Sequence, residues 1–121
     1  MSYSLAFLTR PAPGISYEEF FDHYTRIHRP LAEQLPELLY YRQTRIDKSG
    51  YRGDDAIEYS AFSEYVFESA GAAERAWRSP EAKVLDQDAA LFMDGASVLT
   101  MPLNELGTYG GRRSAAGAEN E

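Results

Sequence analysis

The sequence predicts an α+β domain with the ferredoxin-like element order β-α-β-β-α-β and one four-stranded antiparallel sheet. Two observations predict this fold: four β-rich stretches occur along the chain, and stretches with helical periodicity follow only the first and the third of them. Both helices then cover the same face of the sheet. Because the other face keeps apolar side chains, we expect two copies to bury it in a homodimer.

Composition and charge narrow the class of protein. The 121 residues suit one domain, with 44% hydrophobic and 26% charged residues. A net charge of −7 argues against nucleic-acid binding, and no apolar run is long enough to span a membrane. The N-terminus lacks the basic start and long apolar core of a signal peptide, and cysteine is absent. We expect a soluble cytoplasmic protein, with its domain at residues 1–106 and a flexible polar tail at 107–121.

The first strand is expected at Tyr3–Thr9, which is β-rich and apolar on both faces. The following helix, Tyr17–His28, has Ser16 as its N-cap and Glu19 three residues later to complete a capping box. Its apolar face consists of residues at helical spacing: Phe20, Phe21, Tyr24, Ile27, His28 and Leu31. We expect Pro30 to end this helix and to bias the preceding residue toward an extended conformation.

Two strands are expected in the middle of the chain, at Leu38–Ile46 and Ile57–Phe67, joined by a polar loop over Asp47–Ala56. Neither face of the first strand is cleanly apolar, which is typical of a strand that lines a pocket, an interface or an exposed edge. In the second strand Glu64 lies between apolar neighbours on its own face, so we expect it to be shielded from solvent.

A short Ala-rich helix is expected at Ser69–Trp77, and a second at about Pro80–Met93 with Ser79 as its N-cap and proline at its first position. Gly95 is expected at the C′ position of that helix. The last strand, Ser97–Leu103, contains a proline and is therefore expected at an edge or at a strand end.

Each helix places one polar residue on its apolar face. His28 follows Tyr24 by four residues, where a leucine would be expected, and Asp88 has the equivalent place in the second helix. Since the helices lie side by side on the sheet, we expect His28 and Asp88 within hydrogen-bonding distance. They could be a general acid/base with an orienting carboxylate, or two core residues that satisfy each other. His23 is expected to point off this face, and Asp86 toward solvent.

Further candidates come from the strands. Tyr41 and Tyr24 could hold or protonate a substrate oxygen, although aromatic residues here could equally pack. Glu64 could be a shielded base, or the partner of Arg42 or Arg45 in a cross-strand ion pair. No cluster of His, Asp or Glu has metal-ligand spacing, and the sequence has no phosphate-binding Gly-rich loop and no Gly-x-Ser-x-Gly elbow. We therefore expect neither a metal nor a cofactor.

The run LTRPAPGISYEEFFDHYTRIHRPLAEQLPELLYYRQTRI resembles the EthD family. The positions that carry the resemblance in this half are Arg10, Pro11, Phe20, Tyr24, His28, Pro36 and Tyr41. In the second half they are Glu64, Phe67, Ser69, Ser79, Pro80, Glu81, Asp88, Phe92 and Glu105. The resemblance covers about residues 3–106. Glu37 stands where the family usually has Gly, so the turn geometry could differ here.

The resemblance implies a dimeric α/β barrel. It makes the chain similar to methylmuconolactone methylisomerases and to small polyketide cyclases, dehydratases, decarboxylases and cofactor-free monooxygenases. The resemblance to the methylisomerases would imply a mechanism that uses two histidines. Such a mechanism is not expected for this chain, because His23 is expected to point away from His28.

We interpret the chain as a cofactor-independent enzyme that uses acid/base chemistry. The reaction would be cyclisation, dehydration, isomerisation or decarboxylation of a small hydrophobic oxygenated compound, for example an aromatic polyketide. His28 would move a proton, Asp88 would fix its tautomer, and Tyr41 would polarise a substrate oxygen. The residues expected to contact the substrate are Tyr24, Glu64 and Phe92. Two alternatives stay open: a non-catalytic binding or accessory protein, and a haem-binding protein, since related dimeric barrels bind haem through a His.

Overall fold

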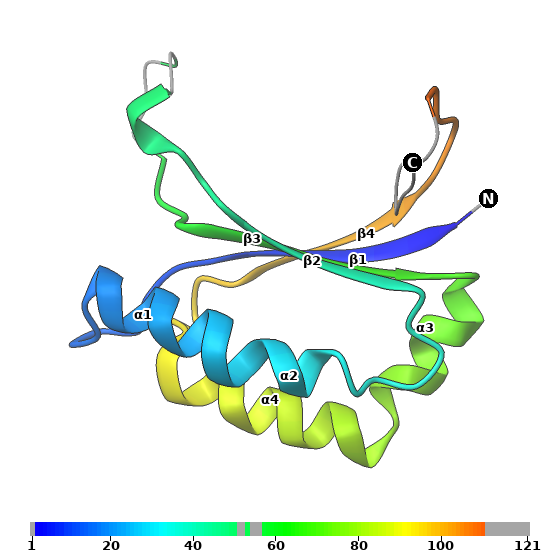
Figure 1. Cartoon of the computed structure of the whole chain (residues 1–121), viewed down its shortest axis with the longest axis horizontal. Coiled ribbons are helices and arrows are strands. Elements are labelled where there is room, and N and C mark those ends of the chain that lie inside the picture. The colour runs from blue at the N-terminus through cyan, green and yellow to red at the C-terminus, as the bar shows by residue number, and fades with distance from the viewer. Residues whose placement is uncertain (1, 51–52, 54–56, 111–121) are drawn as a thin grey trace.

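The computed structural model describes residues 2–50, 53 and 57–110, which form one antiparallel sheet with α1–α4 on one face (Figure 1). The strands, in the order β2-β3-β1-β4, are β1 (Tyr3–Thr9), β2 (Tyr40–Arg45), β3 (Ala61–Phe67) and β4 (Leu99–Asn104). The helical elements are α1 (Tyr17–His23), the π-helical turn η1 (Tyr24–His28), α2 (Arg29–Ala32), the 3₁₀ turn η2 (Lys48–Gly50), α3 (Ala70–Trp77) and α4 (Pro80–Phe92). The predicted ferredoxin-like fold is confirmed.

The middle strands are shorter than the sequence predicts. β2 and β3 pair from Tyr40 opposite Val66 to Arg45 opposite Ala61. The pairing therefore stops at Arg45, where β2 ends. Residues 57–60 precede the ladder and form no strand. The predicted loop at 47–56 and the predicted tail at 107–121 lie partly outside the described residues. The described part of the loop includes η2, and the described part of the tail is residues 107–110. The domain boundary at residue 106 stays a prediction.

The first helical stretch continues through Pro30 to Ala32, so the prediction that Pro30 ends it is wrong. Arg29 has φ −57° and ψ −50°, which is helical and not extended. The reason is the π turn η1, in which the N–H of Arg29 donates to the carbonyl of Tyr24, five residues earlier. A wider turn relieves the clash that a proline ring makes with the carbonyl four residues before it in a regular α-helix.

The helices of the second half begin as predicted and end differently. Ser69 and Ser79 cap α3 and α4, and each side chain accepts a backbone N–H from three residues further on. Helix α4 ends because Met93 turns to an extended conformation (φ −101°, ψ 146°) and forms an isolated β-bridge with Pro11. Gly95 is therefore not the C′ residue that the sequence suggests, and its φ is not positive.

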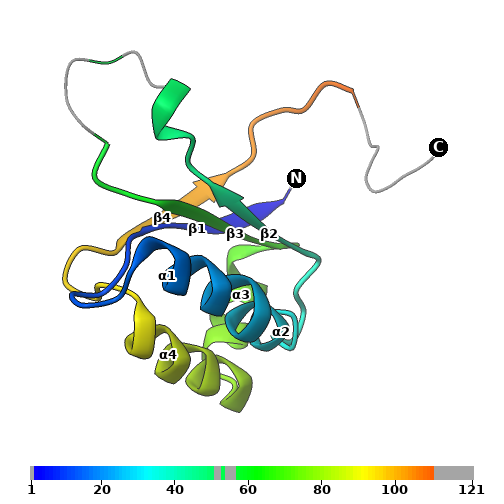
Figure 2. The same ribbon diagram turned by 60° about the vertical axis from the view of Figure 1, so that its left-hand side comes forward.

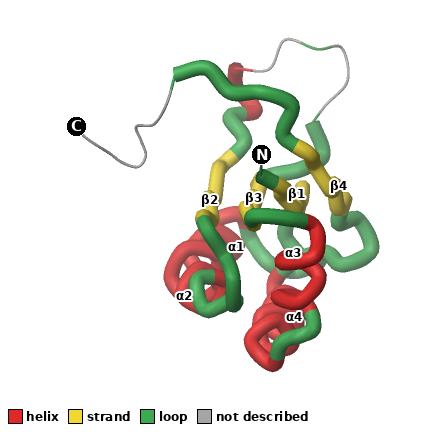
Figure 3. The backbone as a smooth tube through the Cα atoms, turned by 90° about the vertical axis from the view of Figure 1, so that its right-hand side faces the viewer, coloured by secondary structure: helices red, strands yellow, loops and turns green. Residues whose placement is uncertain are grey.

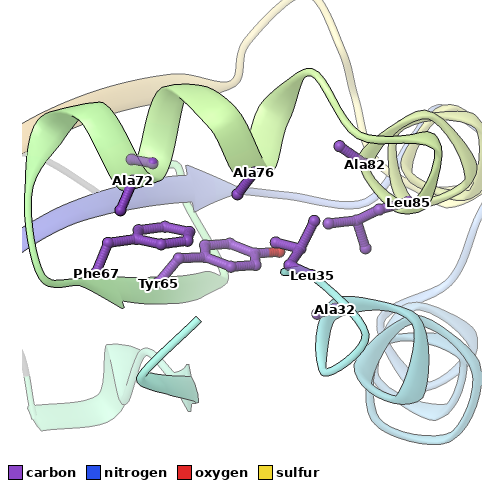
Figure 4. Close-up of a cluster of buried hydrophobic side chains, with 9 residues drawn as sticks. Ala32, Leu35, Tyr65, Phe67, Ala72, Ala76, Ala82 and Leu85 are labelled. Carbon is purple, nitrogen blue, oxygen red and sulfur yellow. The ribbon is translucent and has the colours of Figure 1, made fainter. Parts of the chain in front are cut away.

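The main core lies between the sheet and the helices α3 and α4 (Figure 4). The rings of Tyr65 and Phe67 lie between β3 and α3, where the side chains of α3 are small (Figure 4). Leu35 and Leu85 close one end of this cluster beside the Tyr65 ring (Figure 4). A second cluster surrounds the end of α4: Phe20, Phe21, Tyr24, Ala61, Phe92 and Met93.

Among the described residues, no α-helix lies on the face of the sheet opposite α1–α4 (Figures 2 and 3). The strand register puts apolar side chains on this open face: Leu8, Tyr40, Phe62, Val66, Leu99, Met101 and Leu103. Tyr40, Leu99 and Leu103 are 40–46% exposed in the single chain. An apolar face on a sheet, here interrupted by the Arg42–Glu64 ion pair, is typical of a surface that another protein covers.

Glu37 has a left-handed backbone conformation, with φ 63°. This conformation costs a non-glycine residue about 1 kcal/mol or more. The turn between α2 and β2 therefore keeps the geometry that a glycine favours, although Glu occupies the position. In partial compensation, Glu37 forms a bidentate ion pair with Arg75 of α3, at 2.8 Å for both N–O distances. Because both side chains are exposed to solvent, which screens their charges, this pair contributes little to stability.

Replacing Glu37 separates these two effects. Glu37→Ala loses the ion pair and keeps the backbone strain, whereas Glu37→Gly loses the ion pair and relieves the strain. We expect Glu37→Gly to be more stable than Glu37→Ala by about 1 kcal/mol, measured by urea unfolding with unchanged m-values. Equal stability of the two variants would show that the left-handed conformation costs nothing here.

The hydroxyl of Thr9 is a second local cost. Thr9 is 1% exposed, and its Oγ1 has no hydrogen-bond partner among the described residues. We expect the isosteric change Thr9→Val to raise the free energy of unfolding by about 1 kcal/mol, because it removes a buried unsatisfied hydroxyl. Thr9→Ser keeps the hydroxyl and should lose about 1 kcal/mol with the methyl group. A less stable Thr9→Val variant in urea unfolding would mean that the hydroxyl is satisfied in solution.

Candidate functional site

One carboxylate joins the two helical stretches that pack side by side on the sheet, α1–η1 and α4. Asp88 of α4 accepts a hydrogen bond from each of two histidines: its Oδ2 lies 2.8 Å from Nδ1 of His28, and its Oδ1 lies 2.9 Å from Nε2 of His23. The predicted contact between His28 and Asp88 is therefore present. The side chains of His28 and Asp88 are 3% and 8% exposed, and that of His23 is 26% exposed. The group thus runs from the buried interior toward solvent.

The π turn explains why both histidines reach Asp88. His23 and His28 are five residues apart, which in a regular α-helix turns the two side chains well away from each other. Because η1 has i→i+5 hydrogen bonds, residues five apart lie nearly above one another across it. The prediction that His23 points off the buried face is wrong for this reason. A proline late in a helical pattern, at position 30, was the available sign of a wider turn.

Phe92 holds the two imidazoles in place. Its ring centroid lies 4.3 Å from that of His23 and 5.1 Å from that of His28. On its other sides it packs against Phe20 and Tyr24. Phe92 is not among the residues that line the cleft beside His28, so it does not offer a surface to a substrate there as the sequence suggested. Its role in this structure is to pack against the site residues.

Burial lowers the pKa of the His28 imidazole below its ordinary value, and the neighbouring Asp88 carboxylate opposes that shift. His28 is therefore neutral at pH 7. A carboxylate can only accept, so the single ring proton of neutral His28 lies on Nδ1, facing Asp88. Its Nε2 then carries the lone pair, and the hydrogen bond that this ring forms within the described residues is at Nδ1. This is the protonation state that a general base requires.

His28 lines a cleft of about 210 Å³ between the sheet and α4. The lining comes from β1, β3, α4 and the segment after it: Phe7, Thr9, Ser63, Tyr65, Leu85, Asp86, Ala89, Met93 and Val98. Asp88 is absent from this lining, so the carboxylate lies behind the imidazole, on the side away from the cleft. A cavity of about 150 Å³ already holds a benzene-sized molecule. The cleft is therefore large enough for one ring of a small compound.

Hydroxyl groups lie along the sheet side of the cleft. Ser63 Oγ and Tyr24 Oη are 2.5 Å apart, and Tyr65 also lines the cleft. Burial raises the pKa of Tyr24 and of Tyr65 above the ordinary range of a phenol. Both phenols therefore stay protonated at neutral pH and can act only as neutral hydrogen-bonding groups. Ser63 and Tyr65 were not predicted as site residues. The alternating pattern of the strand places them on one face of the sheet, but it does not show which helix covers that face.

Tyr41 does not lie in this cleft. It lines a separate groove of about 450 Å³ between β2 and the η1–α2 segment, together with Tyr24 and Gln43. Its hydroxyl accepts a hydrogen bond from Gln43 Nε2 at 2.9 Å. The expectation that Tyr41 polarises a substrate oxygen beside His28 is therefore not supported by position, because β2 is an edge strand and the cleft is formed over β1 and β3. Although larger, the groove contains neither His28 nor Asp88.

Glu64 lies on the opposite face of the sheet from His28. It is paired in register with Arg42, and Arg42 Nη2 donates to Glu64 Oε1 at 2.8 Å. Its side chain is 19% exposed, so the expected shielding is present, but the cause is the cross-strand ion pair that the sequence left as the alternative. A role of Glu64 in binding a substrate next to His28 is excluded by this geometry.

Two further features concern the described residues as a whole. Among them, no group of three or more His, Asp or Glu side chains is arranged to hold a metal ion. No helix in the same part of the chain is both long and apolar enough to cross a bilayer.

Solved structures share the fold. An EthD family protein from Bacillus halodurans matches with a TM-score of 0.74 at 24% identity, covering 88% of this chain and 100% of that one. A dimeric ferredoxin-like protein of unknown function from Thermobifida fusca matches with a TM-score of 0.64 at 13% identity, covering 85% and 90%. SnoaB, a cofactor-independent oxygenase from Streptomyces nogalater, matches with a TM-score of 0.57 at 14% identity, covering 88% and 93%.

A search of curated protein sequences finds no match. The family comparison is more informative, because the EthD domain model matches residues 12–96. That range contains η1, α4 and both histidines that bind Asp88. The match extends over more than half of the 121 residues and agrees with the resemblance that the sequence itself suggests. The chain therefore belongs to the EthD family.

Proposed function

We propose that the protein is a cofactor-independent acid/base enzyme in which His28 removes a proton from a small hydrophobic oxygenated compound. The observation that carries this proposal is the position of His28 between Asp88 and the cleft. One ring nitrogen is bound to a buried carboxylate, and the ring lines the cleft. Cyclisation by aldol addition, dehydration and isomerisation share one step that this arrangement supports, the removal of a proton next to a carbonyl.

The proton transfer can be followed atom by atom. The Nε2 lone pair of His28 takes a proton from the carbon next to a carbonyl, and the electron pair of that C–H bond moves toward the carbonyl oxygen. The imidazolium that forms is stabilised by the Asp88 carboxylate at 2.8 Å. Ser63 and Tyr65, which line the same cleft, supply hydroxyls to the developing enolate oxygen. This assignment replaces Tyr41 in the role of polarising the substrate oxygen.

Exchange of carbon-bound hydrogen tests the proposal without the natural substrate. Acetophenone in D₂O supplies a single ring and an exchangeable methyl group, and NMR follows its deuteration. We expect the protein to accelerate exchange and His28→Gln to reduce the accelerated rate by about 100-fold or more. Asp88→Asn should have a similar effect, because an amide can donate to Nδ1 and so move the ring proton to Nε2.

The control is Asp22→Asn, which removes a carboxylate from an exposed pair with Arg26 at a distance from the cleft. It should leave the exchange rate unchanged. Exchange at the background rate with the unaltered protein would favour the alternative, a binding or accessory protein without catalysis. Full activity of His28→Gln would remove His28 from the mechanism.

The pH dependence of exchange has a defined sign. His28 acts as a base only when it is deprotonated, and burial lowers its pKa below the ordinary value of 6.5. The rate should therefore rise with pH through a midpoint below 6.5 and then stay constant through neutral pH. A rate that still rises between pH 7 and pH 9 would indicate a different base.

We further propose that the open face of the sheet is covered by a second copy of the chain. The apolar residues on that face and the description of the Thermobifida fusca structure as dimeric support a homodimer. Light scattering after size exclusion should give twice the 13.6 kDa chain mass. Leu103→Glu, on the open face, should shift the mass toward one chain, since it buries a charge in the interface.

The matched control for the dimer is Leu91→Glu. Leu91 lies on α4, outside the open face, and is 68% exposed. The same chemical change should leave the mass unaltered there. A monomeric mass for the unaltered protein at micromolar concentration would contradict the proposed dimer.

A further inference from the structure

We infer that His23 is a positioning residue, which sets how strongly His28 attracts a proton by holding and partly neutralising the carboxylate that they share. The inference rests on the proposed role of His28 as a base and extends that role to a second histidine. It assigns to His23 no contact with a substrate, because His23 is not among the residues that line the cleft.

Two hydrogen bonds hold the carboxylate of Asp88 in one orientation. A carboxylate bound at one oxygen can rotate about its Cβ–Cγ bond and present either oxygen to its partner. Asp88 is bound at both oxygens, by imidazoles that belong to the same helical stretch. The Phe92 ring packs against both imidazoles and limits their movement. His23 therefore fixes the plane of the carboxylate, and with it the direction in which His28 donates.

The two histidines also share the negative charge of the Asp88 carboxylate. A carboxylate that accepts from two donors divides its negative charge between two hydrogen bonds and stabilises a positive charge on either donor less. The charge of His23, whose side chain is 26% exposed, also opposes protonation of His28 and lowers the pKa of that imidazole. Loss of His23 should thus make His28 a stronger base.

Other charged and titratable groups near His28 are few. Asp86 of α4 lines the cleft, and its charge favours protonation of His28. Tyr24 on the same helical stretch and Tyr65 on β3 both keep their protons at neutral pH, since burial raises their pKa. The described residues that line the cleft include no Lys or Arg. Burial, together with the balance between Asp88, His23 and Asp86, therefore determines the charge of His28.

Three substitutions at position 23 separate the hydrogen bond from packing. His23→Phe keeps a ring against Phe92 and removes the donor, and His23→Asn keeps an amide that is too short to occupy the Nε2 position. His23→Gln carries an Nε2 donor of similar reach that does not titrate near neutral pH. Their effect is read from the ¹⁵N NMR titration of His28 and from the pH profile of acetophenone exchange.

We expect the NMR midpoint of His28 to move upward in His23→Phe and His23→Asn, and the rising limb of the exchange profile to move upward with it. His23→Gln should stay closer to the unaltered protein. An unchanged midpoint in both His23→Phe and His23→Asn would overturn the inference, as would equal shifts in all three variants. Because the titration needs no turnover, its result is independent of whether His28 proves to be catalytic.

Discussion

The buried carboxylate of Asp88 is the constraint around which the helical layer is arranged. A charge in the interior is costly unless donors surround it, and the described structure supplies two imidazoles from a single neighbouring helical stretch. This requirement fixes the rotation of the η1 segment relative to α4. It also fixes the position of the Phe92 ring, which packs against both imidazoles. The polar group and the aromatic cluster therefore depend on each other for their geometry.

The sheet separates two kinds of surface. Alternation along β1 and β3 sends Phe7, Ser63 and Tyr65 to the helical side, where they form one wall of the His28 cleft. The residues between them, including Glu64, go to the open side. If the two proposals above hold, chemistry and association can change independently, since substitutions on one face do not enter the other. Members of one family can share the fold and the assembly while their clefts differ.

Much of the fold could be predicted from the sequence, because caps, strand patterns and element order all agree. The His28–Asp88 contact followed from the same reasoning, since each residue interrupts an apolar helical face. His23 was missed because the prediction applied 100° per residue across a segment that contains a π turn. Tyr41 was misplaced because the mixed faces of this strand fit a pocket, an interface or an exposed edge equally well, and the structure places β2 at the sheet edge. Pairing partners and helix register depend on tertiary contacts that local patterns do not encode.

The η1 turn also bears on how the chain length of this helix can vary in the family. Five residues in a π turn cover roughly the rotation that four cover in an α-helix. A relative that lacks one residue between positions 24 and 27 would form a regular α-helical turn there, and its two histidines would still be aligned on one face. The deletion of one residue at this point therefore leaves the two histidines aligned on the same face of the helix. Alignments that place a gap inside this helix can accordingly be structurally correct.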